Sequence, residues 1–144
     1  MIKIICVGKL KEKYLKYLVD DYKNRVNKYH KLEIVELKDS DILSEAFEIK
    51  KHIDKKSVIV TMEINGTKLN SVELSNKIDK WLMNYGYITF IIGGSDGLHK
   101  SIKNISNYEM SFSNLTFPHG LFRGFLLEQI YRSFKILNGE TYHK

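Results

Sequence analysis

The sequence predicts an α/β protein, a single domain over residues 1–144 with a mostly parallel sheet and helices on both faces. Short β-rich apolar runs alternate along the chain with longer segments whose apolar residues recur every three or four positions. One run, YITFII at 87–92, is a continuous apolar stretch interrupted only by a threonine, which is typical of a strand buried on both faces of a sheet. A length of 144 residues with one proline also favours one undivided domain.

The first part of the chain alternates strand and helix. The apolar run 2–7, closed by Gly8, predicts the first strand. From about 10 to 29, apolar and aromatic residues recur at helical spacing with lysines between them, which predicts an amphipathic helix. LEIVEL, 32–37, is short and partly alternating, as expected for a strand, and residues 42–53 return to roughly helical spacing.

The middle of the chain repeats this order. SVIVTMEI, 57–64, is a β-branched strand that we expect to end at the turn pair Asn65-Gly66. Ser71 is then placed to cap the next helix, with Glu73 in its first turn. One face of this helix is apolar: Leu74, Ile78, Trp81 and Leu82.

The last part begins with the buried strand 87–92. A short helix near 98–105 and a strand at 108–113 follow it. Pro118 can open the final helix, because a first helical residue needs no N–H, and Asn138-Gly139 can end it. This helix is apolar around more of its circumference than one buried face requires. The core could account for this, but a homodimer interface explains it better.

The charge balance is basic, with a net charge of +6 and a pI near 9.2. Eight basic residues lie between Lys9 and Lys31, and three acidic residues oppose them. Such a patch attracts a polyanion, for which nucleic acid is the obvious candidate. A solvated helix face accounts for the lysines equally well, so charge alone leaves both interpretations open.

Cysteine usage and hydropathy indicate the compartment. Cys6 stands alone in an apolar segment, which favours a reducing environment and leaves no intramolecular disulfide. The opening MIKIICVGK is typical of a strand and not of a signal peptide. No apolar run approaches the ~20 residues that a membrane span needs. We therefore expect a cytoplasmic protein with no membrane partner, and the absence of a Cys/His cluster predicts no metal.

IIGGSDGLH, 91–99, places three glycines behind the buried strand. The spacing matches neither the dinucleotide fingerprint nor the P-loop, so both common phosphate sites are excluded. In an open α/β sheet, ligands bind beyond the carboxyl ends of the strands, where Gly93 lies. Missing side chains at Gly93 and Gly94 allow a ligand to approach the backbone, and a tight turn is the alternative explanation.

FSNLTFPHG, 112–120, is a second loop between a strand and a helix. Short polar residues alternate in it with apolar ones, so it can offer hydrogen bonds to a base edge while apolar side chains enclose the ring. A turn with Thr116 capping the last helix is the alternative. We expect the two loops to form two sides of one pocket.

Five motifs now point to a known family: VGKLKEKY, IIGGSDGLH, SFSNLTFPH, EQIYRSFKI and the terminal TYHK. In this order they closely resemble the bacterial ribosomal RNA large subunit methyltransferase H family, of the SPOUT class of knotted methyltransferases. The resemblance covers 2–144 and is weakest over 40–56, where this chain is shorter than the usual member. It implies a deep trefoil knot in the region 85–144, which the general rarity of knots argues against.

The resemblance implies an enzyme that methylates N3 of a pseudouridine, position 1915 in helix 69 of 23S rRNA. The cofactor implied is S-adenosyl-L-methionine, which becomes S-adenosyl-L-homocysteine, and no metal is needed. The family acts as a homodimer on the assembled 70S ribosome. By motif, the cofactor contacts fall on Met62, Gly93, Phe112, Ser113, Asn114, Leu115, Thr116 and Phe117. Leucine is common in the family at the first of these positions, and methionine is similarly apolar.

The resemblance also implies a substrate side. Glu128 and Arg132 lie four residues apart on the last helix, where a surface ion pair of ~0.2–0.5 kcal/mol is the alternative. His119 follows Pro118 and can carry a proton or have a structural role. In the family the tail Tyr142-His143-Lys144 matters for activity and is thought to complete the active site of the partner. The last residue of the tail is commonly arginine in the family. Lys144 keeps the positive charge but cannot form the bidentate hydrogen bonds of an arginine.

Two other functions are compatible with the residues. A non-catalytic RNA- or ribosome-binding α/β domain would use the lysine-rich first helix. A flavodoxin-type nucleotide domain needs a glycine- or hydroxyl-rich loop after the first strand, and the sequence has only Gly8 there. Cofactor binding separates the enzyme from the RNA-binding domain.

Overall fold

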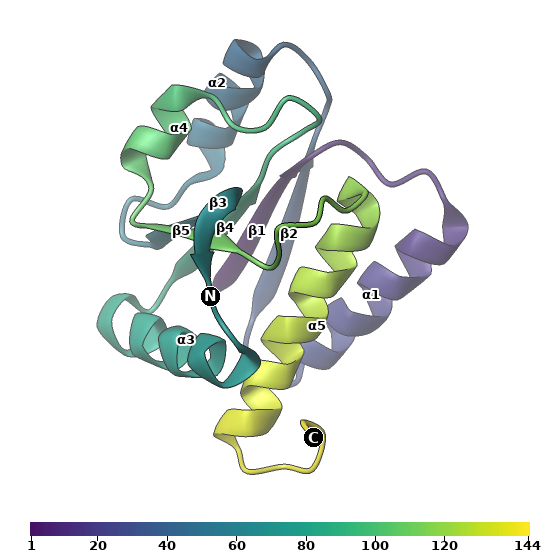
Figure 1. The fold of residues 1–144 in the computed structure, drawn as a ribbon, viewed down its shortest axis with the longest axis vertical. Helices are drawn as coiled ribbons and strands as arrows, with labels where there is room; N and C mark the ends of the chain where they lie inside the picture. The colour runs from purple at the N-terminus through teal and green to yellow at the C-terminus, as the bar shows by residue number, and fades with distance from the viewer.

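Figure 1 shows the fold of the computed structural model, which describes residues 1–144. Five strands form one sheet in the order β2-β1-β4-β3-β5, and all neighbouring strands are parallel. The strands are β1 (Ile2–Val7), β2 (Leu32–Leu37), β3 (Val58–Lys68), β4 (Ile88–Ile92) and β5 (Tyr108–Ser111). The helices are α1 (Lys13–Asn27), α2 (Ile42–His52), α3 (Ser71–Tyr85), α4 (Lys100–Ile105) and α5 (His119–Leu137). The predicted α/β class and parallel sheet are confirmed.

Helices cover both faces of the sheet, as predicted (Figure 1). On one face α1, α3 and α5 pack over the larger core, which includes Ile4 and Phe90. On the other face α2 and α4 cover a smaller core around Ile5 and Ile91. Neighbouring residues of one strand thus enter different cores, because side chains alternate across a sheet. α5 lies between α1 and α3 and packs against both.

β4 lies in the middle of the sheet, and all five of its residues are buried. This confirms the prediction of a strand that is covered on both faces. Its carboxyl end is next to the carboxyl ends of β1 and β3, since all three strands are parallel. The loop that carries Gly93 therefore begins at the edge of the sheet where ligands of α/β proteins bind.

One boundary prediction is wrong in β3. The strand does not end at the turn pair 65–66 but runs to Lys68. Its register against β5 shifts between Met62 and Thr67, and pairing resumes beyond the irregularity. A Cβ on the second residue of the pair would lie 2.7 Å from a backbone carbon of β5. Glycine there allows the two strands to approach, so the pair serves an irregular strand and not a turn.

The cap of α3 also differs from the prediction. Asn70, not Ser71, is the N-cap, and it forms a capping box with Glu73. The side chain of Asn70 accepts from the Glu73 amide at 2.8 Å, and Glu73 accepts from the Asn70 amide at 2.9 Å. Ser71 is the first helical residue, and its hydroxyl donates across to Gln129 on α5 at 2.7 Å.

The other boundaries differ by a few residues. α1 begins at Lys13, and β5 ends at Ser111. Pro118 is the N-cap of α5 and not its first helical residue. α2 forms within the segment where the resemblance is weakest, with Asp41 as an N-cap that accepts from the Ser44 amide.

Buried Arg123 fixes the start of α5 against the first two strands. Its Nη1 lies 2.6 Å from Oε2 of Glu36, and its Nη2 donates to the Gly8 carbonyl at 3.0 Å. Cys6 is buried nearby, where it donates to the Val35 carbonyl. Burial raises the pKa of the Cys6 thiol to about 11, so it stays protonated near neutral pH and is no nucleophile.

Candidate functional site

A cavity of about 470 Å³ opens at the carboxyl edge of the sheet. The glycine loop after β4 lines one side of it, and the loop after β5 lines the other. The structure therefore brings together the two loops that the sequence singles out. Seven of the eight expected cofactor contacts line this pocket: Met62, Gly93, Phe112, Ser113, Leu115, Thr116 and Phe117.

The glycine loop is a tight turn, and its first residue, Gly93, presents only backbone to the pocket. A Cβ at Gly93 would lie 2.8 Å from the carbonyl carbon and oxygen of Gly97. Gly97 donates to the Gly94 carbonyl at 3.0 Å, and its φ of 75° suits glycine. The turn and the close approach are thus both present: Gly97 makes the turn, and Gly93 has no room for a side chain.

Aromatic side chains form the opposite side of the pocket. The ring of Phe112 lies 5.0 Å from that of Phe122, and Phe117 stacks on Phe122 at 6.2 Å. The loop itself is held by Ser113, whose hydroxyl accepts from the Leu115 amide at 3.0 Å. The pocket is therefore enclosed by rings that α5 and the loop contribute together.

Two residues of this loop differ from their expected places. Asn114 is exposed and does not line the pocket. Thr116 lines the pocket and does not cap α5, because Pro118 is the N-cap and no side chain caps that helix. His119, the first residue of α5, is exposed and also lines the pocket.

The pocket contains charged residues that sequence reasoning missed: Glu63, Lys103 and Glu109. Glu63 accepts from the Thr61 hydroxyl at 3.0 Å and lies 3.2 Å from the Lys103 ammonium. A signal was available, because Glu63 directly follows Met62, near the end of the strand that the sequence predicts. Nothing in the sequence around Lys103 places it near the pocket, because α4 reaches the pocket only through the tertiary fold.

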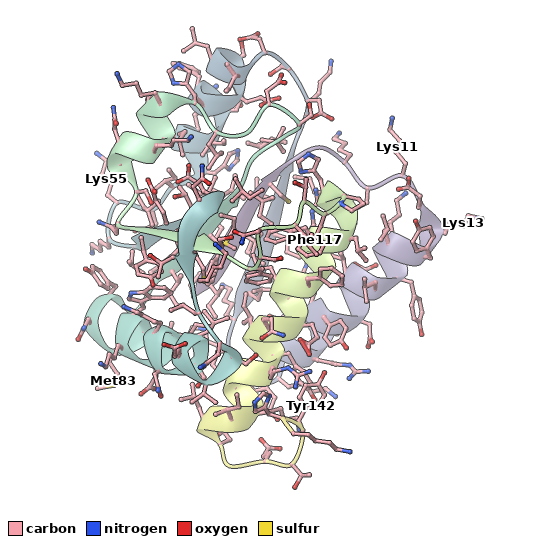
Figure 2. All side chains as sticks on the ribbon, viewed as in Figure 1. Lys11, Lys13, Lys55, Met83, Phe117 and Tyr142 are labelled. Carbon is pink, nitrogen blue, oxygen red and sulfur yellow. The ribbon has the colours of Figure 1, made fainter.

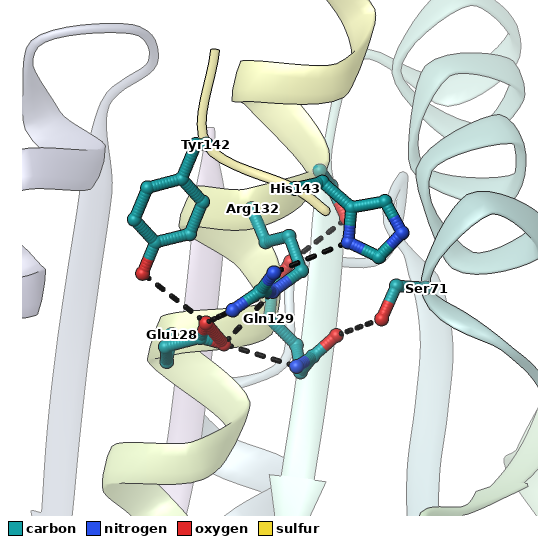
Figure 3. A network of polar contacts seen from close by, with 7 residues as sticks. Ser71, Glu128, Gln129, Arg132, Tyr142 and His143 are labelled. Atoms are coloured by element: carbon teal, nitrogen blue, oxygen red, sulfur yellow. Dashed lines mark hydrogen bonds and ion pairs between the residues drawn. The ribbon is translucent and has the colours of Figure 1, made fainter.

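A polar network joins the chain end to α5, as Figure 3 shows. Glu128 accepts from Arg132 through both Nε, at 2.9 Å, and Nη2. The Tyr142 hydroxyl donates to the same carboxylate at 3.2 Å, and Arg132 Nη1 lies 3.1 Å from Nδ1 of His143. The expected substrate-side residues Glu128, Arg132, Tyr142 and His143 are thus in contact, whereas Lys144 is exposed at the chain end.

This network limits what its members can do chemically. The hydrogen bond to Glu128 raises the pKa of Arg132. The pKa of Tyr142 is also raised, mainly by burial and then by its hydrogen bond to Tyr22 and the negative charge of Glu128. Tyr142 therefore stays a neutral phenol near neutral pH. Arginine only donates, so Nδ1 of His143 is the acceptor in this contact. In this arrangement neither side chain is a free base.

A second cavity, of about 800 Å³, is a groove between α3 and α5. Its residues include Asn70, Ser71, Glu128, Gln129 and His143. Part of its wall is common with the first pocket, because four residues line both: Met110, Ser111, Phe112 and Phe117. The network therefore borders a groove that lies next to the glycine-loop pocket.

The family is decided by comparison with known proteins. A family model described as "Predicted SPOUT methyltransferase" matches residues 1–143. The chain belongs to the SPOUT methyltransferase family. The resemblance noted from the motifs is confirmed, and so is the class of enzyme.

Curated relatives match this SPOUT methyltransferase from end to end. The ribosomal RNA large subunit methyltransferase H of Caldicellulosiruptor saccharolyticus is 44% identical over 154 residues, covering 100% of both chains. The protein of the same name from Clostridium tetani is 45% identical over 157 residues, covering 99% of each chain.

Solved structures share the fold at low identity. A probable methylase family protein from Haemophilus influenzae superposes with a TM-score of 0.60 at 15% identity, covering 99% of this chain and 70% of that one. The ribosomal RNA small subunit methyltransferase E of Neisseria gonorrhoeae, bound to S-adenosyl methionine, gives 0.54 at 10% identity, covering 94% and 65%. These likenesses support the SPOUT fold.

The residues of the glycine-loop pocket fit a sulfonium cofactor. Gly93 lines the pocket with backbone alone, because the Gly97 backbone packs where its Cβ would be. Aromatic faces, such as that of Phe117, attract a cation. Of the two carboxylates in the pocket, Glu63 is paired with Lys103, and Glu109 favours positive charge. No group of three or more His, Cys, Asp or Glu residues in this SPOUT methyltransferase is arranged to hold a metal ion.

The lysines just before and at the start of α1 are solvated. Figure 2 shows Lys11 and Lys13 projecting from the start of α1, away from the pocket beside Phe117 and from Tyr142 at the far end of α5. Lys9 and Lys16 are exposed as well. No helix of the chain is long and apolar enough to span a membrane.

Proposed function

We infer that this chain transfers a methyl group from S-adenosylmethionine to N3 of pseudouridine 1915, in helix 69 of 23S rRNA within the assembled ribosome. The observation that carries this function is that a pocket lined by the backbone of Gly93 adjoins a polar groove. The names of full-length relatives at 44–45% identity support the rRNA substrate. The cytoplasm is the compartment we propose, because assembled ribosomes are there.

The reaction is a direct displacement. The bond from N3 to the methyl carbon forms as the carbon–sulfur bond breaks, and the cofactor leaves as S-adenosylhomocysteine. The N3 proton must also leave, and alignment of N3 with the methyl group supplies most of the rate. The pocket would hold the cofactor through Gly93 and the 112–117 loop, and the groove would hold the base.

We propose His119 as the group that accepts this proton. It lines the cofactor pocket at the start of α5, whereas His143 and Tyr142 are engaged in the network. His119→Asn should lower kcat by about tenfold and leave the cofactor Kd within twofold. Unchanged kcat would exclude His119 from proton transfer.

We propose that the enzyme works as a homodimer through α1 and α5. These helices pack side by side and still expose Tyr14, Tyr17 and Phe125. Exposed aromatic residues on adjoining helices are typical of an interface. Within one chain the tail contacts Glu128 and Arg132, and we propose that across the dimer it also reaches the partner's active site. Mixing a Gly93→Val protein with a chain ending at Thr141 should then restore activity that neither has alone.

The experiment for the function uses 70S ribosomes that lack the modification, together with cofactor labelled in its methyl group. Label should appear on N3 of one pseudouridine of 23S rRNA. Label on another nucleoside, or on free RNA alone, would contradict the substrate. The basic surface of α1 favours a second candidate, a non-catalytic RNA-binding domain, and a titration that finds no cofactor binding would favour it.

A further inference from the structure

The groove between α3 and α5 carries a row of hydrogen-bonding groups along one side (Figure 3). The Ser71 hydroxyl donates to Oε1 of Gln129 at 2.7 Å, and Nε2 of Gln129 donates to Oε2 of Glu128 at 3.0 Å. The amide of Gln129 is thus held at both ends. Its orientation is fixed by these partners, because the oxygen faces a donor and the nitrogen faces a carboxylate.

Several other polar groups of the groove are already hydrogen-bonded within the protein. Glu128 already accepts from Arg132, Tyr142 and Gln129. The side-chain oxygen of Asn70 is used by the capping box. An amide oxygen has two lone pairs and an amide nitrogen has two protons, so Gln129 keeps one of each. The hydroxyl oxygen of Ser71 keeps its lone pairs as well. These two residues can therefore still bind a ligand, as can the amide nitrogen of Asn70 and Nε2 of His143 at the rim of the groove.

The position of the groove fits a methyl acceptor. It shares the wall formed by Phe112 and Phe117 with the cofactor pocket. A reacting nitrogen must come within about 3–3.5 Å of the methyl carbon, so the acceptor base has to enter beside that wall. Aromatic rings there can stack on a base while polar groups opposite contact its edge. Gln129 and Ser71 line the same groove.

We propose that Gln129, held by Ser71, is a specificity-determining residue that recognises the acceptor base as pseudouridine. This inference rests on the proposed function. Pseudouridine presents an N1–H donor where uridine has a C5–H, so an acceptor facing that edge distinguishes them. The spare lone pair of Gln129 Oε1 is that acceptor, and its spare N–H donates to a carbonyl of the base. Uridine would leave the second lone pair of this half-buried oxygen unfilled, which lowers its affinity relative to pseudouridine.

The test compares ribosomes that carry the pseudouridine without its methyl group with ribosomes that carry uridine at that position. For the wild type, kcat/KM should be at least tenfold higher with pseudouridine. Gln129→Met keeps the volume of the side chain and removes both polar groups, so this preference should fall by about tenfold. Ser71→Ala removes the group that orients the amide and should reduce the preference about threefold. Asn76→Ala, an exposed change on α3, is the matched control.

Cofactor affinity separates this role from a structural one. Neither Gln129 nor Ser71 lines the cofactor pocket, so the Kd for S-adenosylhomocysteine should stay within twofold in both variants. An unchanged preference for pseudouridine in folded Gln129→Met, at any level of activity, would overturn the proposal. If that variant does not fold, an unchanged preference in Ser71→Ala overturns it. Failure of the wild type to methylate either ribosome would instead contradict the proposed function.

Discussion

The glycine-loop pocket and the α3–α5 groove lie side by side but are built by different means. The pocket is made by backbone, at Gly93 and along 112–117, and by aromatic rings. The groove is made by side chains that hold one another, with Glu128 at their centre. Phe112 and Phe117 belong to both.

This difference implies a division of tasks. A backbone pocket changes little with side-chain chemistry, which suits a cofactor that every turnover uses. A side-chain network sets the identity and alignment of the substrate, and it depends on the tail being in place. Substitutions in the pocket should therefore affect cofactor binding and transfer together, whereas substitutions in the network should affect transfer alone.

The largest expected effect is that of Gly93→Val. The new side chain would begin 2.8 Å from the Gly97 backbone, so the glycine loop would have to shift to make room. Cofactor affinity should fall by about 100-fold, or ~2.7 kcal/mol, measured by calorimetric titration. Gly97→Asn is the control in the same turn: its Cβ meets open space, and asparagine tolerates a φ of 75°. Normal cofactor affinity in Gly93→Val would contradict the claim that the backbone at Gly93 forms the cofactor site.

Arg132→Lys should have the next largest effect. Lysine keeps the charge but loses the two-point contact with Glu128 and the link to His143. Methyl transfer should fall by about tenfold, which corresponds to losing one charged hydrogen bond of ~1.4 kcal/mol. The cofactor Kd should stay within twofold. A parallel loss of cofactor affinity would mean that the groove and the pocket are not separate.

The smallest expected effect is on the pH dependence of protein stability, through His30, which packs at the C-terminal end of α5. His30 stacks on Phe134 at 6.1 Å, and burial lowers its pKa. The folded state thus favours the neutral ring, so this contribution to stability is present above about pH 6.5 and is lost as pH falls through the lowered pKa.

His30→Phe removes that titration. The advantage of wild type over the variant in melting temperature should therefore be smaller at pH 5 than at pH 7.5, in parallel melts followed by circular dichroism. An advantage that grows on acidification would contradict the direction of the shift. Cofactor affinity, measured at pH 7.5, should be equal in the two proteins, since His30 lies outside the pocket.

The sequence predicts the pocket better than the groove, for a physical reason. Strand ends and glycines are local features, so Gly93 and the 112–117 loop can be found from periodicity and placed at one edge of the sheet. The groove depends on side chains from helices distant in the chain, such as Ser71 and Gln129. Nothing local to either residue predicts that contact.

The tail shows the same limit. Residues beyond Asn138 have no periodicity, and without the family resemblance they would be taken for a frayed end. The structure instead packs the ring of Tyr142 against Tyr131 at 5.0 Å and places His143 on Arg132. The prediction of a turn at Asn65-Gly66 was wrong for the opposite reason. There the local sequence signal was strong, but pairing between β3 and β5 continues the strand past it. The knot expected over 85–144 stays a prediction.

The division of tasks is tested most directly by a chain that ends at Thr141. Cofactor Kd and single-turnover methyl transfer to unmodified 70S ribosomes would be measured on it and on the full chain. Truncation removes Tyr142 and His143 from the network and leaves every residue that lines the pocket. The Kd should stay within twofold while transfer falls by about 100-fold, or ~2.7 kcal/mol. Full transfer activity in the truncated chain, or equal losses of binding and transfer, would contradict the account.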